Sequence, residues 1–139
     1  MLYAVIDTNV LVSALLSSHE DAATVQVVKR MFLGAFIPLY SEQIMAEYCE
    51  VLSRKKFRFP LEVVSTMLKA IRRYGYIVDA TSTGESLPDP KDLPFYEIVM
   101  EKRDDNAFLV TGNMRHFPQK SFIVTAREFL EILDAPISS

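Results

Sequence analysis

The chain opens with Met1-Leu2-Tyr3-Ala4-Val5-Ile6-Asp7-Thr8-Asn9, an apolar run that ends in a carboxylate. Apolar residues follow one another here without polar alternation, which is typical of a central strand covered on both faces. Such strands carry their functional groups at the carboxyl end, where Asp7 stands. The run therefore predicts a buried first strand that presents an acid, suited to anchor a metal ion, at one edge of a sheet.

Short apolar runs and stretches of helical periodicity alternate along the rest of the chain. Further strands are expected over residues 35–40, 76–78, 107–111 and 122–124, and helices over 10–16, 18–32, 41–52, 60–74, 92–99 and 125–133. This alternation predicts an α/β fold, a three-layer α/β/α sandwich with a central parallel sheet of four to five strands. Helices are expected to start at Asn9, at a capping box of Ser18 and Asp21, and at Ser41 and Thr125.

The composition is that of a globular protein, with 50% hydrophobic and 24% charged residues. No apolar stretch reaches the roughly 18 residues that a membrane span needs. We expect a single domain over residues 1–139, with a frayed tail at 135–139. The net charge of −3 provides no global basic field for nucleic acid, and the single cysteine, Cys49, is expected in the core of a cytoplasmic protein.

Several polar residues are expected at one edge of this sheet, because the carboxyl ends of parallel strands and the starts of the following helices converge there. They are Asp7 after the first strand, Glu47 on the inner edge of a helix, Asp92 at a helix start, and Thr111 and Asn113 after the fourth strand. Three carboxylates that meet without a cation repel one another, and a divalent ion removes the conflict. Oxygen ligands without a Cys or His cluster favour Mg²⁺ or Mn²⁺ over zinc. A hydrated ion held in this way is suited to phosphodiester hydrolysis.

Each of these acids also has a plainer structural interpretation. Asp7 and Asp92 are good helix N-caps, and Glu47, taken alone, is an ordinary solvated helix residue. Asp89 is expected to belong to the turn before the Pro94 helix, and His116 to a loop.

Four blocks of the sequence, in this order and at this spacing, resemble the PIN domain family, and within it the branch of toxins from toxin–antitoxin systems. The blocks are Asp7-Thr8-Asn9-Val10, Ser41 to Tyr48, Asp89 to Glu97, and Leu109 to Pro118. The resemblance runs essentially from end to end. It implies a Mg²⁺- or Mn²⁺-dependent endoribonuclease in which Asp7, Glu47 and Asp92 match the family's three main acids.

The family's fourth acidic position is replaced in this chain. Many members have Asp where Asn113 stands, and others have Asp where His116 stands. The reduced charge favours one well-held ion, with Asn113 acting through water and with Asn9 and Thr111 in supporting places. The resemblance also implies an RNA substrate, an antitoxin partner and a homodimer.

A basic segment follows the helix over residues 41–52. Cations are favoured at a helix C-terminus by the helix dipole alone. However, the cations of this segment stand beside Phe57 and Phe59, and a combination of positive charge and aromatic rings is expected where a protein binds single-stranded RNA. The candidate RNA contacts in this segment are Arg54, Lys55, Lys56 and Arg58.

Two other functions are also compatible with parts of the pattern. A phosphatase of the haloacid dehalogenase type likewise places Asp after its first strand, but it needs a second Asp two residues on, where this chain has Asn9. A catalytically degenerate PIN-like module, which binds RNA or a partner protein without cutting, is kept open by Asn113.

Overall fold

Five parallel strands form one sheet in the order β3-β2-β1-β4-β5. The computed structural model describes residues 1–136; residues 137–139, within the tail predicted to fray, lie outside the described residues. The strands are β1 Tyr3–Ile6, β2 Ile37–Tyr40, β3 Tyr76–Ile77, β4 Ala107–Val110 and β5 Ile123–Val124.

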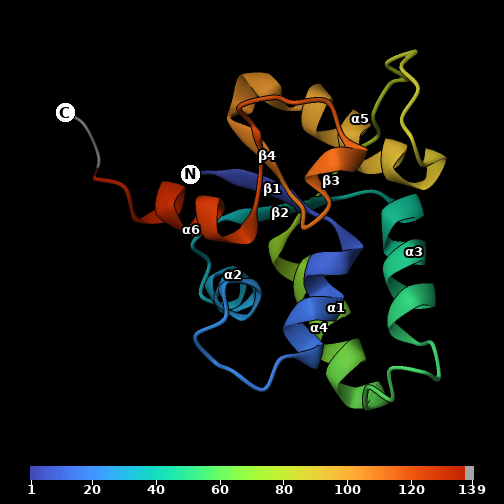
Figure 1. Ribbon diagram of the computed structural model, residues 1–139, viewed down its shortest axis with the longest axis vertical. Coiled ribbons are helices and arrows are strands. Elements are labelled where there is room, and N and C mark those ends of the chain that lie inside the picture. Colours follow the sequence, from blue (N-terminus) through green and yellow to red (C-terminus); the bar gives the residue numbers. More distant parts are fainter. Residues whose placement is uncertain (137–139) are drawn as a thin grey trace.

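Helices cover both faces of this sheet (Figure 1). On one face α5 packs against β1 and β4, whereas α1, α2 and α4 lie on the other, where α6 packs against α2. The predicted three-layer α/β/α fold is confirmed.

None of the helices within residues 1–136 is long and apolar enough to cross a membrane. The helices are α1 Thr8–Leu16, α2 Ala23–Phe32, α3 Glu42–Leu52, α4 Leu61–Tyr74, α5 Leu93–Glu101 and α6 Ala126–Asp134, with short 3₁₀ turns η1 Pro90–Asp92, η2 Arg103–Asp105 and η3 Met114–His116.

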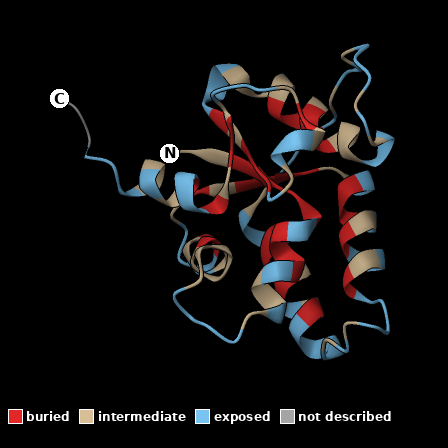
Figure 2. Cartoon of the chain, in the orientation of Figure 1, coloured by how far each residue is buried: buried red, intermediate tan, exposed pale blue. Residues whose placement is uncertain are grey.

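The first strand is the centre of the sheet, as its apolar run predicts. Ala4 and Val5 are fully buried, and the buried residues gather where the layers meet (Figure 2). The chain leaves β1 for β2 on one side and later returns to β4 on the other, so the strand order reverses between β1 and β4. Ligands of open α/β sheets bind at the carboxyl ends of the strands at such a switch point. In this register Ile6 lies opposite Val110, which brings the residues after both strands together.

Two of the four predicted helix starts are wrong. Helix α1 begins at Thr8, because Asp7 already has the extended backbone of an N-cap residue, so Asn9 lies inside the helix and is exposed. Helix α2 begins at Ala23 without a side-chain cap. The Ser18 and Asp21 capping box does not form, and in this turn it is the Ser17 hydroxyl that accepts a hydrogen bond from the backbone of His19, a local pairing that competes with helix capping.

The other two helix starts are confirmed. Ser41 accepts a hydrogen bond from the N–H of Ile44, and Thr125 forms a full capping box with Glu128. The placement of Cys49 in the core is wrong, because the buried face of α3 carries Tyr48 and its apolar neighbours and leaves the thiol exposed.

Gly75 ends α4 where the chain turns into β3, and no side chain fits there. A Cβ atom would overlap the carbonyl oxygen of Ile71 and lie 2.6 Å from that of Pro38. Gly75→Ala is therefore expected to lower the free energy of unfolding by about 2 kcal/mol or more, the scale of an overpacked site. Gly112→Ala is the matched control, since a Cβ there meets no atom within 4 Å. Urea unfolding measures both, and equal stability of the two variants would contradict this packing.

Candidate active site at the carboxyl edge of the sheet

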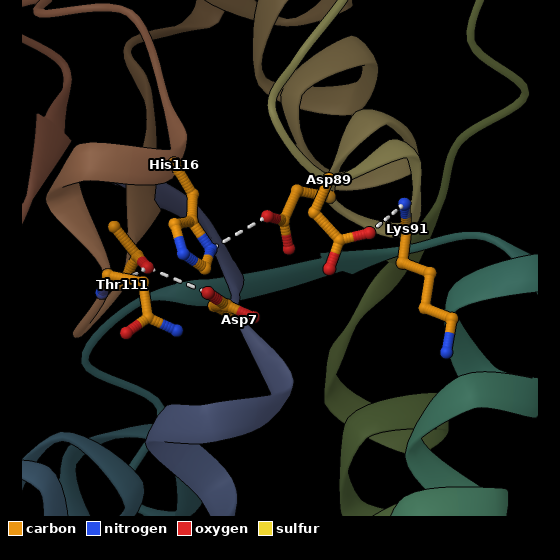
Figure 3. A network of polar contacts seen from close by, with 7 residues as sticks. Asp7, Asp89, Lys91, Thr111 and His116 are labelled. Atoms are coloured by element: carbon orange, nitrogen blue, oxygen red, sulfur yellow. Dashed lines mark hydrogen bonds and ion pairs between the residues drawn. The ribbon is translucent and has the colours of Figure 1, made fainter.

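Asp7 stands where β1 ends and α1 begins, with only 3% of its surface exposed. The hydroxyl of Thr111, which follows β4, donates a hydrogen bond of 2.7 Å to its Oδ2 (Figure 3). The backbone N–H of Asn113 in turn donates to the Thr111 hydroxyl oxygen at 3.0 Å. Asp7 occupies the N-cap position of α1, yet its carboxylate makes no capping hydrogen bond. Its side chain therefore binds the residue that follows β4 and does not cap α1.

Glu47 reaches inward from α3 to the same edge. The hydroxyl of Thr8, the first residue of α1, donates a hydrogen bond to its carboxylate. The next residue on α3, Tyr48, is buried and donates a 2.5 Å hydrogen bond to the carbonyl oxygen of Ile6, the last residue of β1. This contact fixes α3 against the end of the central strand. The solvated interpretation of Glu47 is therefore wrong, because the side chain is half-buried and held by Thr8.

Asp92 holds the N-cap position of α5, and it does not cap that helix either. Its Oδ2 instead lies 3.1 Å from Nδ1 of His116. Capping is done one turn earlier by Asp89, which accepts a hydrogen bond of 3.0 Å from the N–H of Lys91 at the start of η1 (Figure 3). Asp89 thus belongs to the turn, as predicted, and the carboxylate of Asp92 is left free to face the site.

The loop that leads to Asp92 is fixed on α5 by two acids. Glu101 accepts hydrogen bonds from the N–H and the hydroxyl of Thr81, at 3.0 and 2.8 Å. Glu97 accepts one of 3.0 Å from the N–H of Thr83. Because α5 packs on β1 and β4, these contacts attach the first part of the loop to the layer that covers the central strands.

Burial raises the pKa of all three acids, and the charge of Asp7 adds to this effect at Glu47 and Asp92. Burial raises the pKa of Asp7, opposed by the Thr111 hydroxyl and by backbone N–H groups at the start of α1. Burial also raises the pKa of Glu47, opposed by Thr8 and reinforced by the negative charge of Asp7. Burial, followed by the charges of Asp7 and Asp89, raises the pKa of Asp92 to about 6. All three carboxyl groups therefore favour a nearby positive charge.

The donor set fits a divalent cation by its chemistry. Carboxylate oxygens without thiolate ligands suit Mg²⁺ or Mn²⁺, and mutual repulsion of the acids is what such an ion relieves. Within residues 1–136, however, no three His, Cys, Asp or Glu side chains are gathered closely enough to ligate one ion. Each acid has its own partner instead: Thr111 for Asp7, Thr8 for Glu47 and His116 for Asp92.

The remaining predicted residues fall into two groups. Thr111 lies in the site as expected, whereas Asn113 contributes its backbone N–H and Asn9 is exposed on α1. In the basic segment Arg54 is paired with Glu50 at 2.9 Å, and the rings of Phe57 and Phe59 stack on each other, 5.2 Å apart, and pack against the core. The aromatic rings there are therefore engaged with the protein itself. Lys55, Lys56 and Arg58 are exposed.

Two partners in the site are not among the residues predicted for it. Thr8 contacts Glu47, and His116, predicted as a loop residue, contacts Asp92. Their positions within the quoted blocks, directly beside Asp7 and three residues after Asn113, were the available signal.

Asp92→Asn is expected to stabilise the metal-free protein by about 1 kcal/mol near pH 7, a value reduced because water screens part of the interaction. The folded-state pKa of Asp92, about 6, lies above its ordinary value of 3.8, so the folded state binds the proton more tightly. The free energy of unfolding of the wild type must then fall as the pH rises from about 4 to about 6. The Asp92→Asn variant, which cannot ionise at this position, is expected to lose less free energy of unfolding over the same range. Urea unfolding in EDTA across this range measures the effect.

Asp134→Asn is a control of opposite sign for this experiment. A hydrogen-bonded ion pair with Arg30, 2.7 Å long, holds the pKa of Asp134 below its usual range, so its neutral variant is expected to be slightly less stable near pH 7. An Asp92→Asn variant that is also destabilised there would contradict the electrostatic conflict described above.

One of three comparisons with known proteins identifies a family for this chain. Searches of curated proteins and of solved structures find no match. A family model described as a PIN domain matches residues 3–115, more than half of the chain. The matched span includes Asp7, Glu47 and Asp92 and ends just before His116. PIN domains are generally nucleases, and the chain belongs to this PIN domain family.

Proposed function

We propose that this protein is a metal-dependent endoribonuclease that hydrolyses RNA phosphodiester bonds, with Asp7, Glu47 and Asp92 holding Mg²⁺ or Mn²⁺. One observation carries the proposal. Asp7 and Asp92 both occupy helix N-cap positions, and neither caps its helix. Asp7 instead accepts a hydrogen bond from Thr111, which follows β4, and Asp92 contacts His116 in η3. The carboxyl edge of a parallel α/β sheet is where ligands bind.

The residues of the chain then have distinct tasks. Thr111 and Thr8 orient the carboxylates of Asp7 and Glu47 through their hydroxyl groups. His116 holds Asp92 at Oδ2. The match of Asn113 to the family's fourth acidic position supports a role for it in the site through water. A bound divalent ion would supply a water of lowered pKa and neutralise the charge that develops on the phosphate oxygens.

RNA as the substrate is supported by membership in a family of nucleases and by the exposed cations that follow α3. The contacts proposed for the RNA backbone are Arg54, Lys55, Lys56 and Arg58. A role as the toxin of a toxin–antitoxin pair, with a protein antitoxin and a homodimeric state, is supported by the resemblance of the four sequence blocks to that branch.

A second candidate is a degenerate PIN module that binds RNA or a partner protein without cutting. The observation that favours it is the separation of the acids, since no three ligating side chains within residues 1–136 lie close enough for one ion. It differs from the first proposal in a measurable way, because such a module would bind RNA and show no metal-dependent cleavage.

Purified protein is expected to cleave single-stranded or structured RNA with Mg²⁺ or Mn²⁺ and to be inactive in EDTA. Asp7→Asn is expected to lower the rate at least about 100-fold, because even the outer partners of metal ligands contribute about 10–100-fold. Asp104→Asn, an exposed acid in η2, is the matched control and should keep full activity. Cleavage that survives in Asp7→Asn, or wild-type protein that cleaves no RNA with either metal, would contradict the proposal.

A further inference from the structure

A cavity of about 340 Å³ lies between α3 and the start of α5, directly beside Glu47. Its floor includes Ile44 and Phe95, both only 1% exposed, and its polar rim includes Gln43 and Lys91. This volume lies near the lower end of the range for small-molecule sites, so it admits one nucleotide and not a helical segment. Of the three proposed catalytic acids, Glu47 lines this cavity.

Lys91 supplies the available positive charge at this cavity. Within residues 1–136 no carboxylate oxygen lies within 4.0 Å of its amine, whereas Arg54 on the same cavity is paired with Glu50. Figure 3 shows its side chain extending away from Asp89 alongside α3. Its charge acts on both Glu47 and Glu50. Glu47 and Glu50 line this cavity and repel a phosphate group. The positive charge of Lys91 is therefore placed to bind it.

We propose that this cavity binds one unpaired nucleotide of the RNA, next to the bond that is cut. Lys91 contacts the phosphate of this nucleotide, Gln43 hydrogen-bonds the edge of its base, and the apolar floor receives the face of the base. A base that is paired and stacked in a duplex cannot enter, so the cavity selects single-stranded RNA. This inference rests on the ribonuclease function proposed above and adds to it a binding site for one nucleotide.

Binding in EDTA at low salt tests the subsite separately from cleavage. Fluorescence anisotropy of a fluorescein-labelled single-stranded hexanucleotide RNA gives the affinity of the full chain. Lys91→Gln is expected to weaken binding about fivefold and to reduce the slope of log K against log salt by about 0.7, the loss of one phosphate contact on a single strand. Lys69→Gln, an exposed lysine on α4, makes the same change of charge elsewhere and should leave the slope unchanged.

Two further measurements separate the contribution of the base to binding from that of the phosphate. Ala46→Trp, an exposed position of α3 that lines the cavity, should block the base and weaken binding without a change in charge. Annealing the hexanucleotide to its complement should weaken wild-type binding and remove the difference between wild type and Ala46→Trp.

The outcomes separate the two proposals. If the wild type binds the hexanucleotide and Lys91→Gln behaves like Lys69→Gln, the subsite is wrong and the ribonuclease proposal stands. If the wild type binds no RNA in EDTA, the subsite is wrong, and metal-dependent cleavage alone decides the ribonuclease proposal. Binding that depends on Lys91, together with no metal-dependent cleavage, supports the subsite as an RNA-binding site and overturns the enzymatic proposal alone.

Discussion

The hydrogen bond from the Thr111 hydroxyl to the carboxylate of Asp7 joins the ends of the two central strands. A carboxylate with 3% exposure at the end of a buried strand is costly unless its oxygens find donors. Thr111 supplies such a donor, and the register of β1 with β4 brings it into place. Asp7 can therefore remain buried at the carboxyl end of β1, where the other residues of the site surround it.

The other two acids come from elements that are tied to these strands. Tyr48 binds α3 to the end of β1 through the carbonyl oxygen of Ile6, which sets the neighbouring Glu47 beside Thr8. Helix α5 packs on β1 and β4, and its acids Glu97 and Glu101 hold the loop that leads to Asp92. The result is a set of carboxylates in which the charge of Asp7 raises the pKa of both Glu47 and Asp92, while each acid is held by a separate partner. This is the state expected of acids that await a cation.

The sequence predicts the features that depend on local pattern. The uninterrupted apolar run before Asp7 identifies the central strand, and the side chains of Ser41 and Thr125 identify two helix starts. It also predicts that the ends of the first and fourth strands converge, because parallel strands share one carboxyl edge.

Features that depend on tertiary contacts are not visible in that pattern. Thr8 meets Glu47 across 39 positions of sequence, and His116 meets Asp92 across 24. Such pairs are set by how α1, α3 and η3 pack around the sheet. The start of α2 is likewise missed because Ser17 bonds to its own turn, an alternative that the spacing of Ser18 and Asp21 does not reveal.

Titration of the protein with Mn²⁺ by calorimetry tests most directly whether the three acids form one metal site. We expect the wild type to bind one ion, and a Glu47→Gln, Asp92→Asn double variant, which keeps Asp7 and its Thr111 contact, to bind it at least about 100-fold more weakly. Equal Mn²⁺ affinity of the two proteins, or no binding by the wild type, would contradict a metal site formed by the three acids.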